Sequence, residues 1–102
     1  EAPHVYLVMA GEEATAGGLQ LAEQLRRQVA GLRIQSNLGG GSFKSQFKRA
    51  DRSGAPLAVI LGEDELREGQ VTIKHLREQT GQEKINLNAL ETWFKNYLRM
   101  LN

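Results

Sequence analysis

Two short apolar runs, each followed at once by a glycine, limit most strongly what this chain can fold into. Residues 5–10 (VYLVMA) and 57–61 (LAVIL) are rich in β-branched and large apolar side chains, which is typical of strands buried on both faces. Between them lie a helical pattern over 16–30, a short half-exposed strand over 32–36 and a second helical pattern over 43–53. Strands that alternate with helices pair in parallel through right-handed crossovers. The first part of the chain therefore predicts a βαβαβ unit.

The second helical pattern has clear signals at both ends. Ser42 is a suitable N-cap because its hydroxyl can accept a hydrogen bond from a free backbone amide, and Gly54 is a suitable stop. Gly31 has the same role after the first helix. Three side chains share one face of the second helix and should pack on the sheet: Phe43, Phe47 and Ala50.

The remaining residues predict a hairpin and a last helix. Residues 63–69 (EDELREG) are expected to form an acidic turn or a single helical turn, 70–77 alternate apolar and polar side chains, and 82–85 can return beside them as a hairpin partner. Asn88 with Glu91 resembles a capping box at the start of the last helix. The sum is an α/β fold, a three-layer α/β/α domain with a mixed sheet of about five strands and three helices.

The composition limits the classes of protein to consider. The 102 residues suit one domain over 1–102, and because the chain begins at Glu1 and enters a strand pattern almost at once, we expect a piece of a longer protein or a processed product. Without cysteine there can be no disulfide and no thiolate metal site. The longest apolar run is too short to span a membrane. The net charge of +1 does not by itself indicate a nucleic-acid binder, so such a function needs a local basic patch.

The two histidines do not suggest catalysis. His4 is expected to be exposed near the start of the chain, and His75 falls in a predicted strand where packing is the simpler role. No Ser, His and Asp set has support from spacing, and no pair of histidines has metal-ligand spacing. We therefore expect no catalytic residue and no metal site in this chain.

The most unusual stretch is 39–55 (GGGSFKSQFKRADRSGA). It matches neither the Walker loop nor the Gly-x-Gly-x-x-Gly dinucleotide pattern. Its glycines would nevertheless let the backbone approach a ligand, and the helix that follows would present free amides beside a row of cations. Such a row is usually a solvated helix face, and on physical grounds phosphate contact is about equally supported. The candidate phosphate-binding residues are Gly40, Gly41, Ser42, Lys44, Lys48, Arg49 and Arg52.

Three acids follow the central strand. Glu63, Asp64 and Glu65 point in different directions, so a solvated turn is the default interpretation and a shared metal is not expected. However, open α/β sheets place ligand contacts at the carboxyl ends of their strands. A carboxylate at this place can accept hydrogen bonds from base edges, which makes at least one of these acids a candidate binding residue.

The central stretch resembles the C-terminal anticodon-binding domain of bacterial histidyl-tRNA synthetases. The resemblance covers nearly the whole chain and lies chiefly in NLGGGSFKSQFKRADRSGAPLAVILGEDEL, with VYLV before it and VTIKHLR after it. Two positions depart from the family pattern. Ser42 stands in place of an asparagine, and Ser45 stands in place of a lysine, which removes one cation.

This resemblance implies a function as well as a fold. It implies a five-stranded mixed sheet with three helices that holds the anticodon stem-loop of histidine tRNA. By position in related synthetases, it implies base contacts from the acidic turn at Glu63 and Glu65 and from Lys74 on the next strand. The domain itself would need no cofactor. The parent enzyme would be a cytoplasmic homodimer, with its catalytic domain in the same chain, that joins histidine to tRNA using ATP and magnesium.

Two other functions stay open at this point. Synthetase-like paralogues keep this architecture as regulatory subunits of a metabolic enzyme, and such a chain would act through protein contacts. Alternatively, the glycine loop could hold a phosphorylated metabolite, which predicts ligand binding without RNA.

Overall fold

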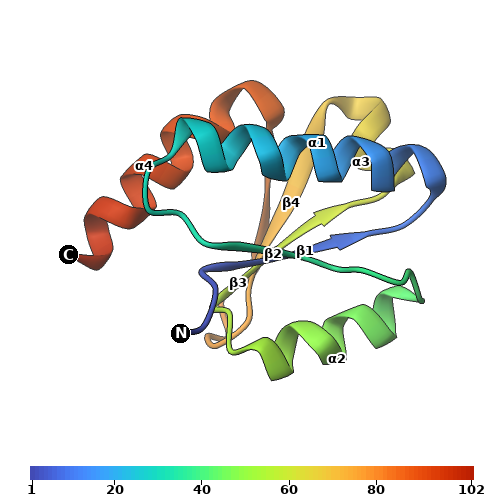
Figure 1. Cartoon of the computed structure of the whole chain (residues 1–102), viewed down its shortest axis with the longest axis horizontal. Coiled ribbons are helices and arrows are strands. Elements are labelled where there is room, and N and C mark those ends of the chain that lie inside the picture. Colours follow the sequence, from blue (N-terminus) through green and yellow to red (C-terminus); the bar gives the residue numbers. More distant parts are fainter.

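The computed structural model describes all 102 residues and forms three layers, with a sheet between helices (Figure 1). The five strands lie in the order β2-β1-β3-β4-β5. They are β1 (Val5–Met9), β2 (Ile34–Ser36), β3 (Leu57–Leu61), β4 (Gln70–His75) and β5 (Gln82–Asn86). The helices are α1 (Glu12–Gln28), α2 (Phe43–Ser53), α3 (Glu63–Glu68) and α4 (Leu90–Leu101), with a 3-10 turn at Leu87–Ala89. The predicted α/β/α architecture with a mixed five-stranded sheet is confirmed.

The sheet has a parallel half and an antiparallel half. β1 lies between β2 and β3 and is parallel to both, with Val5 opposite Ile34 on one side and Leu57 on the other. β4 and β5 then continue the sheet as an antiparallel hairpin. Both chain termini lie at one end of the molecule, and the carboxyl ends of β1 and β3 point toward the other end (Figure 1). No helix combines the length and the apolar composition that crossing a bilayer requires.

The two faces of the sheet are covered unequally. Beneath α1 and α4 lies a cluster of 15 buried residues, in which Val59 and Phe94 are almost fully enclosed. The opposite face has a cluster of only 4 buried residues beneath α2, which includes Tyr6 and Ala50. Because α2 is the only helix on this face (Figure 1), no helix covers the hairpin half of the sheet there.

One structural difference from the sequence prediction is an additional helix, since the chain has four α-helices and three were predicted. The acidic turn forms α3, and its ends explain why. The Glu65 carboxylate accepts a hydrogen bond from the backbone amide of Gly62 just before the helix, and Gly69 ends it in the left-handed conformation. The three acids of the first turn also stabilise the positive end of the helix dipole.

Smaller differences occur at the helix ends. The predicted capping box is wrong, because Asn88 lies in the 3-10 turn and α4 begins one residue after Ala89 without a side-chain cap. α1 starts at Glu12 and ends at Gln28, so it begins and ends earlier than the predicted 16–30, and the residue that ends it is Val29 in an extended conformation, not Gly31. The ends of α2 agree with the prediction: Ser42 accepts a hydrogen bond from the amide of Ser45, and Gly54 takes the left-handed conformation.

The side-chain amide of Gln46 completes the pairing of β1. β2 ends at Ser36, opposite Leu7, so the backbone of Met9 has no partner strand on that side. Gln46 is fully buried, and its Oε1 accepts a hydrogen bond from the Met9 amide at 2.9 Å. Its Nε2 donates to the Met9 carbonyl at 2.7 Å and to the Gly41 carbonyl at 2.9 Å. The amide thus replaces one residue of a missing strand and fastens α2 to the sheet.

Replacing Gln46 by leucine should destabilise the fold strongly. Gln46→Leu leaves three backbone groups without a partner, and each unpaired buried group costs about 1–3 kcal/mol. We expect urea denaturation to show a loss of at least about 2 kcal/mol in unfolding free energy. The matched control is Gln20→Leu on the exposed side of α1, which should change stability by less than about 0.5 kcal/mol. If Gln46→Leu lost as little unfolding free energy as Gln20→Leu, the Gln46 amide would not be what holds α2 in place.

His4 is part of the fold and is only partly exposed, contrary to the prediction. Its Nδ1 accepts a hydrogen bond from the backbone amide of Arg33 at 3.0 Å, which joins the start of β1 to the segment before β2. Burial and, secondly, the charge of Arg33 hold the pKa of His4 below its usual value of 6.5, against the opposing effect of Glu1. The neutral imidazole is therefore the form that the folded chain favours.

The contribution of His4 to stability should depend on pH. This stabilisation is complete above the pKa of His4 in the unfolded chain, about 6.5, and is lost as pH falls toward the lower pKa of His4 in the folded chain. Between these two values the unfolded chain binds more protons than the folded chain. His4→Ala should remove this part of the pH dependence. The measurement is the difference in unfolding free energy between wild type and variant at about pH 7.5 and about pH 5. A difference that does not change between the two pH values would contradict the assignment.

Candidate nucleic-acid interface

The start of α2 presents backbone amides that no protein group uses. Ser42 caps the helix, with its Oγ accepting from the Ser45 amide at 3.1 Å and its carbonyl accepting from the Gln46 amide at 3.0 Å. The amides of Ser42, Phe43 and Lys44 donate to no other residue. They stand at the positive end of the helix dipole, so this end can accept an anion.

In the glycine loop before α2, two carbonyls are held by side chains of the same chain. Gly39, Gly40 and Gly41 all have positive φ, at 88°, 67° and 100°, which other residues adopt only with strain. The Gly40 carbonyl accepts from the side chains of Asn37 and Arg49, at 3.0 Å and 2.8 Å. The Gly41 carbonyl accepts from the buried Gln46 amide described above. The backbone amides of the three glycines make no hydrogen bond within the chain.

The predicted row of cations divides into two kinds. Arg49 reaches into the structure, where its Nη1 donates to Asn37 Oδ1 at 3.0 Å as well as to the Gly40 carbonyl. Asn37 is itself buried and accepts a second hydrogen bond from the hydroxyl of Tyr6 at 2.9 Å. The other three cations of α2 are exposed and form no hydrogen bond or ion pair: Lys44, Lys48 and Arg52.

The residues predicted to contact bases lie in two places. Glu65 is half-buried, with Oε1 bonded to the Gly62 amide at 2.9 Å and Oε2 only 3.5 Å from the hydroxyl of Thr72. Lys74 follows on the same face of β4, and its Nζ stands 5.0 Å from the centre of the Phe47 ring. The structure thus brings Glu65 and Lys74 to the side of the hairpin that no helix covers, beside α2. Glu63 instead lies against Gly11, just after β1. A Cβ built on Gly11 would lie 3.0 Å from Cγ of Glu63.

The sequence did not predict several residues of this region. Gln46, Asn37 and Tyr6 gave no signal, because their partners are backbone and side-chain groups far away in the sequence. Phe43 was expected to pack on the sheet, but it is 38% exposed. As the first residue of α2 it lies beside Gly62, beyond the end of β3, whereas Ala50 on the same helix face is buried as predicted.

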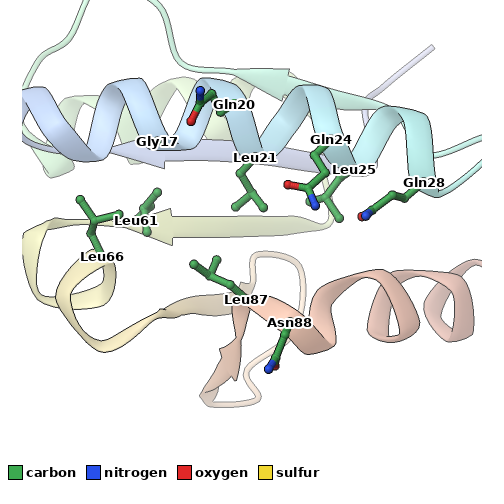
Figure 2. Close-up of a pocket in the computed structure, with 10 residues that line it drawn as sticks. All are labelled: Gly17, Gln20, Leu21, Gln24, Leu25, Gln28, Leu61, Leu66, Leu87 and Asn88. Carbon is green, nitrogen blue, oxygen red and sulfur yellow. The ribbon is translucent and has the colours of Figure 1, made fainter.

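A groove on the opposite side of the molecule is different in character. It lies between α1 and the 3-10 turn and has a volume of about 440 Å³ (Figure 2). Leu21 and Leu25 point into it from α1 toward Leu61 and Leu87, and none of its lining residues is charged. It therefore lacks the cations that a phosphate backbone requires, and the candidate interface is the α2 face.

Comparison with known proteins shows the family to which the chain belongs. The family described as an anticodon binding domain matches residues 4–97. The chain is 46% identical over 96 residues to the histidine–tRNA ligase of Hydrogenovibrio crunogenus and 48% identical over 97 residues to that of Halorhodospira halophila. These matches cover 94% and 95% of this chain but 22% of each relative. The chain thus spans about a fifth of the length of these relatives.

Solved structures resemble the fold over almost the whole chain. Apo histidyl-tRNA synthetase from S. aureus has a TM-score of 0.82 at 28% identity, over 93% of this chain and 24% of that one. Histidyl-tRNA synthetase from Nostoc sp. PCC 7120 has a TM-score of 0.80 at 27% identity, over 96% and 23%. The RNA binding domain of threonyl-tRNA synthetase from Cryptosporidium parvum has a TM-score of 0.82 over 92% and 23%, and at 16% identity it shows the fold alone.

Arg49 should contribute to stability where its neighbours on α2 do not. Arg49→Met removes the two hydrogen bonds that hold Asn37 and the Gly40 carbonyl, and we expect a loss of about 1–3 kcal/mol in urea denaturation. Lys48→Met, a substitution of the same kind one residue earlier, should stay within about 0.5 kcal/mol of wild type. If both variants were as stable as wild type, the hydrogen bonds of Arg49 would have no structural role.

Proposed function

Because the chain belongs to the anticodon-binding domain family, we propose that it binds the anticodon stem-loop of histidine tRNA as one domain of a longer histidine–tRNA ligase. One observation carries this proposal. The unpaired cations stand on α2, and Glu65 and Lys74 lie beside α2 on the same side of the sheet. An extended, flexible loop of RNA can contact both sets at once, since its phosphates and its base edges point in different directions.

The two sets of residues would have different tasks. Lys44, Lys48 and Arg52, with the free amides at the start of α2 and in the glycine loop, would hold phosphates. Such contacts position an RNA but do not read its sequence. Glu65 and Lys74 would contact base edges, because a carboxylate accepts from amino and imino groups and an ammonium donates to ring nitrogens and carbonyls. Glu63 stays a candidate outside this face.

The proposal extends to the whole protein. The relatives at 46% and 48% identity are named histidine–tRNA ligases and are several times longer than this chain. The longer protein would be a cytoplasmic homodimer, and its catalytic domain would use ATP and magnesium to join histidine to tRNA. In that protein the present domain would contribute recognition of the tRNA and no catalytic group.

Binding should combine anticodon preference with salt dependence. We expect this chain to bind a labelled histidine anticodon stem-loop more tightly than the same hairpin with a scrambled anticodon, in titrations at several salt concentrations. The double variant Lys44→Met with Lys48→Met should weaken binding to both hairpins alike. It should also lower the slope of log Kd against log salt by about 0.7–0.9 for each phosphate that the variant no longer neutralises. Lys95→Met on α4, which removes one cation from the other face, is the matched control and should change neither quantity.

Glu65→Gln gives the complementary result in the same titration. Glutamine keeps an oxygen for the Gly62 amide, so the turn of α3 should stay intact while the negative charge is removed. We expect the preference for the cognate hairpin to fall roughly tenfold, since one base contact is worth about 1–3 kcal/mol. The salt slope should change little. The proposed division of tasks would be contradicted if the wild-type chain bound both hairpins equally. It would also be contradicted if the lysine and glutamate variants changed the affinity, the cognate preference and the salt slope in the same way.

A further inference from the structure

We propose that Phe43 is a stacking platform for one unpaired nucleobase, with Glu65 at the edge of the stacked base. The inference rests on the proposed function and deepens it, because it adds a base-binding subsite formed by an aromatic side chain that sequence patterning assigned to the core. The ligand class is a flat heterocycle with amino or imino donors, presented by a single-stranded loop. Three features of the α2 face support it.

The first feature is the exposure of the ring. Phe43 is 38% exposed although it lies next to residues that are well packed, and it is the only aromatic side chain among the large exposed apolar residues. Its neighbour Phe47 is at 6.3 Å between ring centres, with the planes tilted by 42°. Because the two rings are not parallel, Phe47 does not act as a stacked partner for Phe43. The Phe43 ring can therefore receive a flat ligand.

The second feature is the carboxylate at the same place. A Cβ built on Gly62 would lie 3.5 Å from Cζ of Phe43 and 2.9 Å from Oε1 of Glu65, so the ring edge and the carboxylate meet at one glycine. Oε1 is held by the Gly62 amide, which fixes the direction of the side chain. Oε2 has only the 3.5 Å contact with Thr72 and keeps its capacity to accept. A base lying on Phe43 would bring its amino or imino edge toward this oxygen.

The third feature separates Phe43 from Phe47. The ammonium of Lys74 stands 5.0 Å from the centre of the Phe47 ring, so a cation of the protein itself already occupies that ring. Phe47 is also half-buried and packs against the small cluster beneath α2. Phe43 has no such partner. Of the two rings, only Phe43 is thus available to a base, and Lys74 stands nearby to donate to the same or the next nucleotide.

The test is a cycle between protein variants and RNA variants. Wild type and Phe43→Leu are titrated with the histidine anticodon stem-loop and with a set of hairpins that each carry one abasic nucleotide in the loop. We expect Phe43→Leu to weaken binding of the intact hairpin about tenfold, as removal of one stacked base does. At one loop position the abasic hairpin should bind both proteins equally, since the base that Phe43 contacts is already missing. Phe43→Trp should retain binding, and the salt slope should not change.

Two controls keep the result specific. Leu19→Ala changes an apolar residue that is 40% exposed on α1, away from this face, and should leave all affinities unchanged. Thermal unfolding shows whether Phe43→Leu folds like wild type. The proposal is overturned if Phe43→Leu binds the intact hairpin as wild type does, or if its weakening is the same with every abasic hairpin. If wild type prefers the cognate hairpin and Phe43→Leu binds it with the same affinity, only this inference is overturned. If wild type binds no hairpin, the proposed function is overturned as well.

Discussion

The Gln46 amide is the interaction on which the candidate interface depends. β1 has strands on both sides only as far as Leu7, and beyond that residue the backbone of Met9 pairs with a side chain from α2. The same amide holds the Gly41 carbonyl, so the position of the helix and the end of the glycine loop are set together. An apolar residue could pack α2 against the sheet, but it could not fix this register, because dispersion contacts have no direction.

In the glycine loop, different backbone groups serve the fold and remain available to a ligand. The carbonyls of Gly40 and Gly41 accept hydrogen bonds from the side chains of Asn37, Gln46 and Arg49, and the amides of the three glycines stay unpaired. One of the cations of α2 is therefore committed to structure while the others remain free. The end of the molecule that carries the candidate interface is thus held in place by buried polar side chains, each of which has a hydrogen-bond partner.

The sequence predicted those parts of the fold that depend on local pattern. The buried runs of β1 and β3, the hairpin, and the Ser42 and Gly54 ends of α2 all follow from periodicity and capping chemistry. It allowed one helical turn where α3 lies but did not count a fourth helix, because the cap is a glutamate that reaches back to a glycine amide, and it did not predict the inward direction of Arg49. Phe43 was placed in the core because its helix spacing matches that of Phe47, but spacing cannot show where the sheet beneath a helix ends. The predicted phosphate and base contacts are tested only by binding experiments.

The separation of the chain termini from the glycine loop has a mechanical consequence. Both termini lie at one end of a molecule 35 Å long, and the carboxyl ends of the parallel strands, with the loop and the start of α2, lie at the other (Figure 1). When a rigid domain rotates about one end, its other end moves the farthest. A rotation of about 10° at the attachment would carry the far end through roughly 6 Å, about the spacing of one nucleotide, without any change inside the domain. In the proposed longer protein, a small rotation at the point of attachment would therefore change the reach of the whole surface.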